Sequence, residues 1–357
     1  MNHHPVPRRR FVKSLAVASA AATVVSPTIL NATDKSGSGP TIIGGGRYTY
    51  ECIHDWGLSS LPAGHEYGWT SNGVAIDESG RLYVSHHGAP GSIFVFDEDG
   101  RFIRAMAMKH RTEKEAAGHG VDIRKEGDTE FLYLSPDSSD LAFTKMTLDG
   151  EIVWQKGRAD LVKDSGIKLT RYRPTNSSFR PDGGYYLGDG YGSSYVFEYD
   201  KDDNFVRSIG GPGGQDGQFR TPHGQWLDDR DAAPKLVVTD RANQRLQWFA
   251  MDGTHIKSMG GFVKPADIDV QGDLLIVADI GASVTVLDKD DTVVAKLGHN
   301  AELEKRVMDR KLDVRSKRDQ WLPGTFIHPH DACFDRHGNI FVSEYVLGGR
   351  VTKLRKV

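Results

Sequence analysis

The sequence predicts an all-β fold, a six-bladed β-propeller closed by a strand from near the N-terminus. Six similar strand starts recur along the chain, at 71–77, 118–123, 174–179, 221–228, 264–269 and 328–335. A repeat of about 40–50 residues that consists of strands and turns is the signature of a propeller. The composition agrees, because 40 glycines in 357 residues indicate a turn-rich chain rather than a helical one.

Each unit repeats one pattern of short strands joined by Asp/Gly hairpins. In the first unit, strands are expected at 74–77, 82–85, 93–96 and 102–105. The last unit has only three obvious strands, so the alternating segment 48–53 is expected to pair with 350–354 and close the ring. This places Cys52 and Cys333 on strands of one blade that are too far apart for a disulfide, and it predicts two free thiols.

The chain divides into three expected regions. Residues 1–31 are interpreted as an export leader, because the Arg8-Arg9-Arg10-Phe11-Val12-Lys13 segment resembles a twin-arginine consensus and precedes a mild, alanine-rich apolar run. The alternative is a short basic tail followed by a helix. Residues 32–46 are expected to be a Gly/Ser-rich linker, and 47–357 form the propeller. The leader predicts a periplasmic or extracellular protein that is free of the membrane once the signal is removed.

Short helical insertions and the charge balance complete this picture. Helical patterns are expected at 113–117 and 301–316, the second being either a lid over one mouth of the ring or surface decoration. The net charge of −3 gives no basic field of the kind that nucleic-acid binding needs. No run reaches the roughly 18–20 apolar residues of a spanning helix. We therefore expect a monomer that binds neither nucleic acid nor membrane.

Three histidines occupy matched positions in alternate units. His119, His223 and His330 each stand at the entry to the first strand of their unit, at nearly equal spacing. Every second blade of six lies a third of a turn around the axis, so the three imidazoles should point to one spot. Three neutral imidazoles suit Zn²⁺ and leave a fourth position open, although iron, cobalt or copper would accept the same ligands. His299 and His328 fall outside the pattern and are expected to be bystanders.

The six units resemble the peptidyl-α-hydroxyglycine α-amidating lyase family, the lyase half of peptidylglycine α-amidating monooxygenase. The resemblance covers about 48–357, and the segment 237–249 resembles an NHL-type repeat. It implies Zn²⁺ on the three histidines. It also implies a structural Ca²⁺ in the channel, bound by the backbone carbonyls of Val74 and Val121 and the carboxylate of Asp331.

The same resemblance implies roles for residues around the metal. The family's catalytic tyrosine matches Tyr191, and its substrate-binding arginine matches Arg241. A second family arginine is replaced by His87, which cannot reproduce a bidentate guanidinium contact. The implied activity is that of a secreted, metal-dependent carbon–nitrogen lyase. It would split an α-hydroxyglycine-type small-molecule or peptide substrate into an amide and glyoxylate.

Other interpretations stay open at this point. The chain could be a non-catalytic NHL-repeat propeller that binds a protein or glycan, with structural metal in its channel. It could also be a lactonase or other hydrolase, although that class usually ligates its metal with Glu, Asn and Asp. Among single residues, Tyr191 could cap a blade, Arg241 could form a structural bridge with Asp240, and Asp331 could pair with a basic neighbour.

Overall fold

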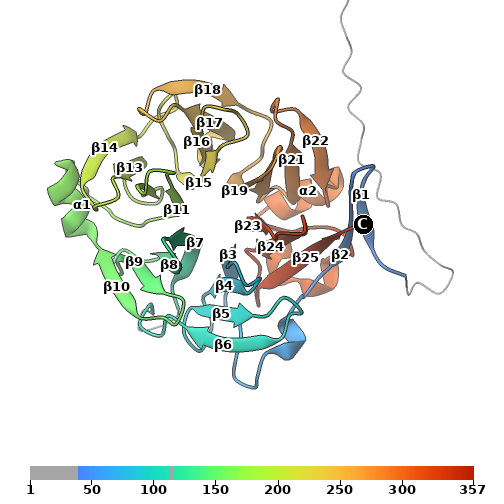
Figure 1. Ribbon diagram of the computed structural model, residues 1–357. Helices are drawn as coiled ribbons and strands as arrows, with labels where there is room; N and C mark the ends of the chain where they lie inside the picture. Colours follow the sequence, from blue (N-terminus) through green and yellow to red (C-terminus); the bar gives the residue numbers. More distant parts are fainter. Residues whose placement is uncertain (1–38, 112–115) are drawn as a thin grey trace, which may run out of the picture.

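The computed structural model describes residues 39–111 and 116–357 and shows six antiparallel sheets arranged as blades around a central axis (Figure 1). The predicted all-β, six-bladed propeller is therefore confirmed. In the first five blades the first strand along the chain is the innermost one, and in the sixth the innermost strand is β23 (Pro329–Phe334). Each innermost strand lies beside the next, and the sixth returns beside the first, so the ring is complete.

The strands occupy equivalent positions in the six blades. The innermost strands are β3 (Ser71–Ile76), β7 (Gly118–Glu126), β11 (Ser177–Phe179), β15 (Pro222–Asp228), β19 (Pro265–Gln271) and β23 (Pro329–Phe334). The second strands are β4 (Leu82–His86), β8 (Thr129–Pro136), β12 (Tyr185–Gly188), β16 (Lys235–Asp240), β20 (Leu274–Asp279) and β24 (Ile340–Glu344). The third strands are β5 (Ile93–Phe96), β9 (Phe143–Thr147), β13 (Tyr195–Tyr199), β17 (Arg245–Phe249), β21 (Ser283–Leu287) and β25 (Arg350–Lys356). Outer strands in five blades are β6 (Phe102–Met106), β10 (Ile152–Lys156), β14 (Phe205–Gly210), β18 (His255–Met259) and β22 (Val293–Leu297).

The sixth blade joins the two ends of the described chain, as the sequence predicts. β2 (Tyr48–Ile53) pairs antiparallel with β25, with Cys52 opposite Leu354. The expected linker 32–46 is too long, however, because β1 (Ile42–Gly45) pairs with β2 as a fifth strand. The reason is the buried Ile43, which packs in one cluster with Leu297 and Phe326. Cys52 and Cys333 are free, as expected. The predicted leader, 1–31, lies outside the described residues.

The hydrophobic core lies between neighbouring blades rather than at the axis. One cluster, for example, joins Tyr83 and Val95 of the first blade to Leu132 and Leu134 of the second. Both faces of each blade are buried in this way, and the innermost strands line a polar channel. The blades therefore form a rigid frame that fixes the side chains at the strand entries.

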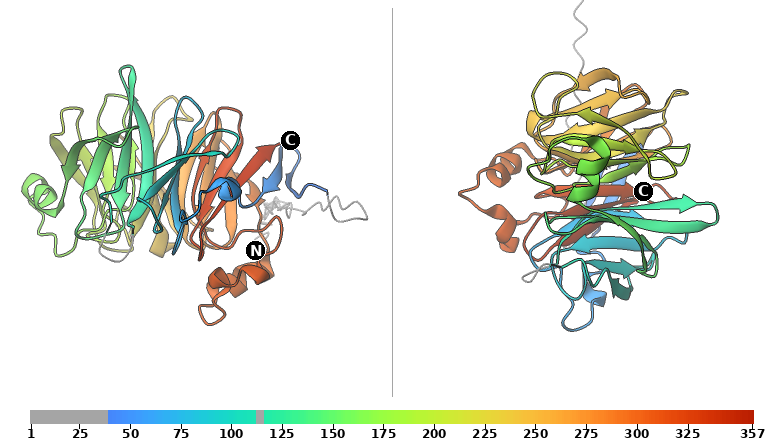
Figure 2. Two further views of the ribbon diagram at one scale, coloured as in Figure 1. Left: turned by 90° about the horizontal axis from the view of Figure 1, so that it is seen from below. Right: turned by 90° about the vertical axis from the view of Figure 1, so that its left-hand side faces the viewer.

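Within the described residues, two α-helices and four 3₁₀ turns interrupt the strands. They are α1 (Arg158–Ser165), α2 (Ala301–Met308), η1 (Leu58–Ser60), η2 (Arg241–Asn243), η3 (Val314–Ser316) and η4 (Arg318–Gln320). The helical expectation for 301–316 is confirmed in part by α2 and η3, which lie on one face of the ring (Figure 2). Helix α1 was not expected, and the segment expected to be helical at 113–117 falls mostly outside the described residues. No helix of the described ranges has the length and apolar character needed to cross a membrane.

Candidate metal centre and active-site cavity

The three matched histidines meet at the axis. Their ring centroids are 4.8–4.9 Å apart, and one nitrogen from each ring lies within 4.8 Å of the others. His119, His223 and His330 enter from β7, β15 and β23, which belong to alternate blades. All three rings are buried. The structure thus brings together the triad that the sequence pattern predicts.

Backbone carbonyls of the intervening blades orient these rings. The Nδ1 atoms of His119 and His223 lie 2.8 Å from the carbonyl oxygens of Thr175 and Ala266. His330 hydrogen-bonds the backbone of Asn72 in the same way. An Nδ1–H that donates to a carbonyl fixes the tautomer and leaves the Nε2 lone pair directed to the common centre, as in metal-binding histidines.

Burial keeps the three imidazoles in the form that binds a metal. Desolvation lowers the pKa of His119 to about 4, and it lowers the pKa of His223 and His330 well below the usual value. All three rings are therefore neutral at physiological pH. A metal requires deprotonated imidazole, so the donor set fits a divalent transition metal.

Tyr191 faces the open side of the triad. Its hydroxyl lies 2.9 Å from Nε2 of His223 and 3.4 Å from Nε2 of His119. The tyrosine stands in a tight turn after β12, where a side chain on Gly190 would collide with the carbonyl of Pro222. This close approach of two blades carries Tyr191 over the axis, so the interpretation that it merely caps a blade is wrong.

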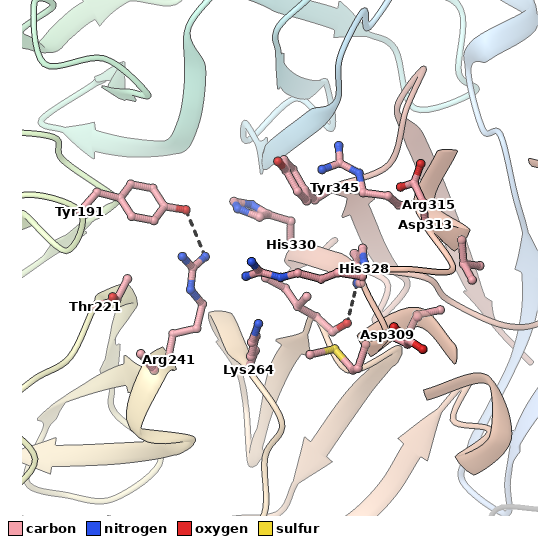
Figure 3. A pocket seen from close by; sticks show the side chains of 16 residues that line it. Tyr191, Thr221, Arg241, Lys264, Asp309, Asp313, Arg315, His328, His330 and Tyr345 are labelled. Carbon is pink, nitrogen blue, oxygen red and sulfur yellow. Dashed lines mark hydrogen bonds between the residues drawn. The ribbon is translucent and has the colours of Figure 1, made fainter. Parts of the chain in front are cut away.

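Arg241 reaches the same hydroxyl from the fourth blade (Figure 3). Its Nη1 donates to the Tyr191 hydroxyl over 3.1 Å, and its guanidinium carbon is 5.0 Å from the ring centroid. The structural bridge that was the alternative for Arg241 is made instead by Arg245, whose Nε lies 2.8 Å from Asp240. Because Arg245 makes this bridge, the guanidinium of Arg241 is available to the cavity.

A partly buried acid–base network lies beside Tyr191. His87 stands 3.7 Å from Asp137, which accepts a 2.6 Å hydrogen bond from Arg173. The guanidinium carbon of Arg173 lies 5.3 Å from the Tyr191 ring, on which Arg241 also rests. Burial raises the pKa of Tyr191, whereas Arg241 and Arg173 both lower it. His87, which stands where the resembled family has a second arginine, is thus linked to Arg173 through Asp137.

A cavity of about 530 Å³ opens above the triad. Its walls include His330, Tyr191 and Arg241 from the propeller, together with Lys264, His328 and Tyr345. The α2–η3 segment supplies the remaining wall with its residues 307–310 and 313–315. The insertion that the sequence analysis left between lid and decoration thus lines the cavity. His328 lines this cavity without joining the triad, and its Nδ1 donates to the carbonyl of Ile280 over 2.8 Å.

The opposite end of the channel is acidic. A second cavity of about 250 Å³ is lined by Val74 and Asp331, together with the further buried aspartates Asp122, Asp267 and Asp269. Burial raises the pKa of all four carboxyls, that of Asp331 to about 7. Clustered carboxylate oxygens are the donors that Ca²⁺ prefers.

The ligands implied for calcium are only partly brought together. Val74 lines the acidic cavity and its N–H donates to Asp331 over 2.8 Å, but Val121, in the adjoining strand β7, is not among the lining residues. The charged groups that interact with Asp331 are other aspartates. The interpretation that it pairs with a basic neighbour is therefore wrong.

Sequence reasoning missed several residues of this region. Asp267 occupies the same place in its repeat as Asp331, because each directly follows the position that holds a histidine in alternate repeats. An alignment of the repeats would therefore have pointed to Asp267. Asp137 and Arg173 stand in loops and Arg315 in the 3₁₀ turn η3, all outside the repeated pattern, so they gave no such signal. Their positions depend on how the loops fold over the ring.

Comparisons with known proteins agree with the fold and the resemblance. The chain is 22% identical over 175 residues to a probable peptidyl-α-hydroxyglycine α-amidating lyase of Caenorhabditis elegans, which covers 48% of this chain. The chain is a distant relative of an amidating lyase. The match spans 46% of that relative's length, and no family model matches the sequence.

Solved structures share the propeller fold. Virginiamycin B lyase from Staphylococcus aureus superposes with a TM-score of 0.55 at 12% identity, covering 86% of this chain and all of that one. A gluconolactonase from Xanthomonas campestris gives a TM-score of 0.57 at 15% identity, covering 92% of this chain and 94% of that one. At such identities the likeness concerns the fold alone. The weak homology to a probable amidating lyase, and not the shared fold, is what favours an enzyme.

Proposed function

We propose that this chain is a metal-dependent lyase that cleaves the C–N bond of an α-hydroxyglycine-type substrate, giving an amide and glyoxylate. One observation carries the proposal: the hydroxyl of Tyr191 lies against the open side of three converging imidazoles and accepts a hydrogen bond from Arg241. A base, a metal-binding triad and a carboxylate-binding cation therefore converge on one small volume, as the reaction needs.

The protein's own groups account for the proton and charge movements. Arg241 binds the carboxylate of the substrate, because a guanidinium offers two parallel N–H donors to it. Burial alone raises the pKa of Tyr191, but a cation held by the triad, together with Arg241, would favour its tyrosinate form, which would take the proton of the substrate hydroxyl. As the C–N bond breaks, the oxygen left behind becomes the carbonyl of glyoxylate, and the departing amide nitrogen receives the proton. No oxidant, reductant or water is consumed.

The triad of His119, His223 and His330 would hold the metal, with Zn²⁺ the ion that three neutral imidazoles suit best. When bound, such an ion supplies a Lewis acid that lowers the pKa of an oxygen placed at its open position. At the acidic end of the channel, Asp331 and its neighbours would hold Ca²⁺ as a structural ion. We also propose that the protein is exported by the twin-arginine route.

The test is glyoxylate release from α-hydroxyhippurate by the zinc-loaded protein. We expect turnover by the wild type and loss of turnover in Tyr191→Phe and His223→Ala. Wild-type activity in both variants would contradict the mechanism. A stably folded, zinc-loaded protein that releases no glyoxylate would favour the non-catalytic binding propeller, and turnover of a lactone in its place would favour a hydrolase.

A further inference from the structure

The cavity above the triad holds a second cationic site that the proposed reaction does not use. Arg315 comes from η3, in the insertion that forms the outer wall of the cavity. In Figure 3, Tyr191 and Arg241 lie on one side of His330, and Arg315 lies on the other side beside Tyr345. The two guanidinium groups therefore face one cavity from opposite walls.

Two aromatic rings fix the plane of the Arg315 guanidinium. Its central carbon lies 3.7 Å from the ring centroid of Tyr345 and 4.6 Å from that of Trp69. Stacking on both faces stabilises a cation and restricts its rotation. The backbone is held as well, because the N–H of Leu347 donates to the Arg315 carbonyl over 3.1 Å. This side chain is thus oriented before any ligand arrives.

The edge of the same guanidinium lacks partners. Its Nε and Nη2 are buried and make no hydrogen bond to any residue of the described chain. Nε and one terminal nitrogen form the fork that binds a carboxylate through two parallel bonds. A buried donor without a partner destabilises the protein, because it has lost its hydrogen bonds to water. A group that satisfies both nitrogens would remove this cost.

The charges around the cavity favour an anion there. Its lining contains four cationic side chains, Arg241, Lys264, Arg310 and Arg315, and two carboxylates, Asp309 and Asp313. Both carboxylates are engaged within the insertion itself, where Asp309 accepts from the N–H of Lys311 and Asp313 from the hydroxyl of Ser316. The cations remain in excess.

We propose that the substrate is a dianion. Besides the carboxylate of its hydroxyglycine part, which Arg241 binds, it carries a second carboxylate on the acyl side, which Arg315 receives. A cavity of about 530 Å³ has room for a small molecule that reaches both walls. This inference rests on the proposed lyase function and specifies its substrate class.

The experiment compares two substrates of the same shape with the zinc-loaded protein. They are 4-carboxybenzoyl-α-hydroxyglycine and its uncharged counterpart, 4-carbamoylbenzoyl-α-hydroxyglycine. We expect kcat/KM for glyoxylate release to be about 10- to 100-fold higher for the carboxylate, as a charge-assisted pair with a desolvated guanidinium should give. Arg315→Gln should bring the ratio close to one, and Arg315→Lys should retain part of it.

A purely structural role for Arg315, as a latch between the insertion and the ring, predicts a different result. Loss of a latch would lower turnover of both substrates and leave their ratio unchanged. The matched control is Arg318→Gln, since Arg318 follows the insertion directly, in η4, but pairs with Asp55 outside the cavity. A ratio near one in the wild type, or an unchanged ratio in Arg315→Gln, would overturn the inference.

Calorimetric binding of 4-carboxybenzamide separates this inference from the proposed function. The amide is the product of the charged substrate, and terephthalamide is its uncharged control. Arg315-dependent binding of the acid without any glyoxylate release would support the anion site and contradict the lyase. Glyoxylate release from both substrates at equal rates would support the lyase and contradict the dianion.

Discussion

The buried carboxyl of Asp269 makes the metal-free protein less stable as the pH rises. This residue lies on β19 at the acidic end of the channel, and burial raises its pKa from an ordinary value of 3.8 to about 7. Hydrogen bonds of 2.7 Å from the N–H groups of Phe334 and Val270 oppose the shift but do not cancel it. The folded state therefore binds this proton more tightly than the unfolded state does.

The sign and size of the effect follow from linkage. Below pH 3.8 both states keep the proton, and above about 7 both have lost it. Between these values the unfolded state alone is ionised, so the free energy of unfolding falls as the pH rises. A shift of about 3 pH units corresponds to a loss of about 4 kcal/mol. Asp331, whose pKa is also raised to about 7, adds a change of the same sign.

Urea unfolding in the presence of a chelator measures this dependence between pH 4 and pH 7.5. The buried triad histidines, whose pKa values are lowered, change the stability of both proteins in the opposite sense. We therefore expect the free energy of unfolding of Asp269→Asn, relative to that of the wild type, to rise steadily with pH over that range. The matched control is Asp252→Asn, because Asp252 is exposed in a hairpin turn and its pKa is lowered, not raised. A difference in free energy of unfolding between Asp269→Asn and the wild type that stays constant between pH 4 and pH 7.5 would refute the reasoning.

Other consequences concern catalysis, the calcium site and the closing blade. Tyr191→Phe should lower kcat for glyoxylate release by about 10²–10⁴-fold, the usual contribution of a general base, with the zinc content unchanged; a variant with wild-type kcat would exclude Tyr191 as the base. Added Ca²⁺ should raise the urea midpoint at pH 7.5, where the channel aspartates need a counter-ion, and Asp331→Asn should remove most of the gain; an equal gain in the variant would argue against this site. Arg350→Met should lower the free energy of unfolding in urea by about 3–5 kcal/mol. The reason is that Arg350 Nη2 donates over 2.9 Å to the buried carboxylate of Glu344, which would lose its cation. A change below about 1 kcal/mol would contradict this.

The repeat pattern was sufficient to predict the ring and the triad. Strand starts at a regular spacing specify blades, and the blade number then specifies which positions face each other across the axis. His119, His223 and His330 meet for this reason, although they lie far apart in the sequence. The pairing of β2 with β25 follows from the same logic, since a blade with one strand missing leaves an open edge.

The walls of the cavity could not be predicted in this way. Arg315 is oriented by Trp69 and Tyr345, which come from other loops and share no periodic pattern with it. Strand β1 was likewise hidden, because a four-residue strand beside glycines looks like a linker until its partner is known. Contacts between loops depend on tertiary packing, whereas the repeat depends on local pattern alone.

The central claim is that the histidine triad binds a metal on which lyase activity depends. The most direct measurement is glyoxylate release from α-hydroxyhippurate by protein stripped of metal and then titrated with Zn²⁺. We predict that activity rises until one zinc ion is bound per chain, and that folded His119→Ala protein neither binds the ion tightly nor turns over the substrate. Stripped protein with full activity, or zinc-loaded protein that releases no glyoxylate, would contradict the claim.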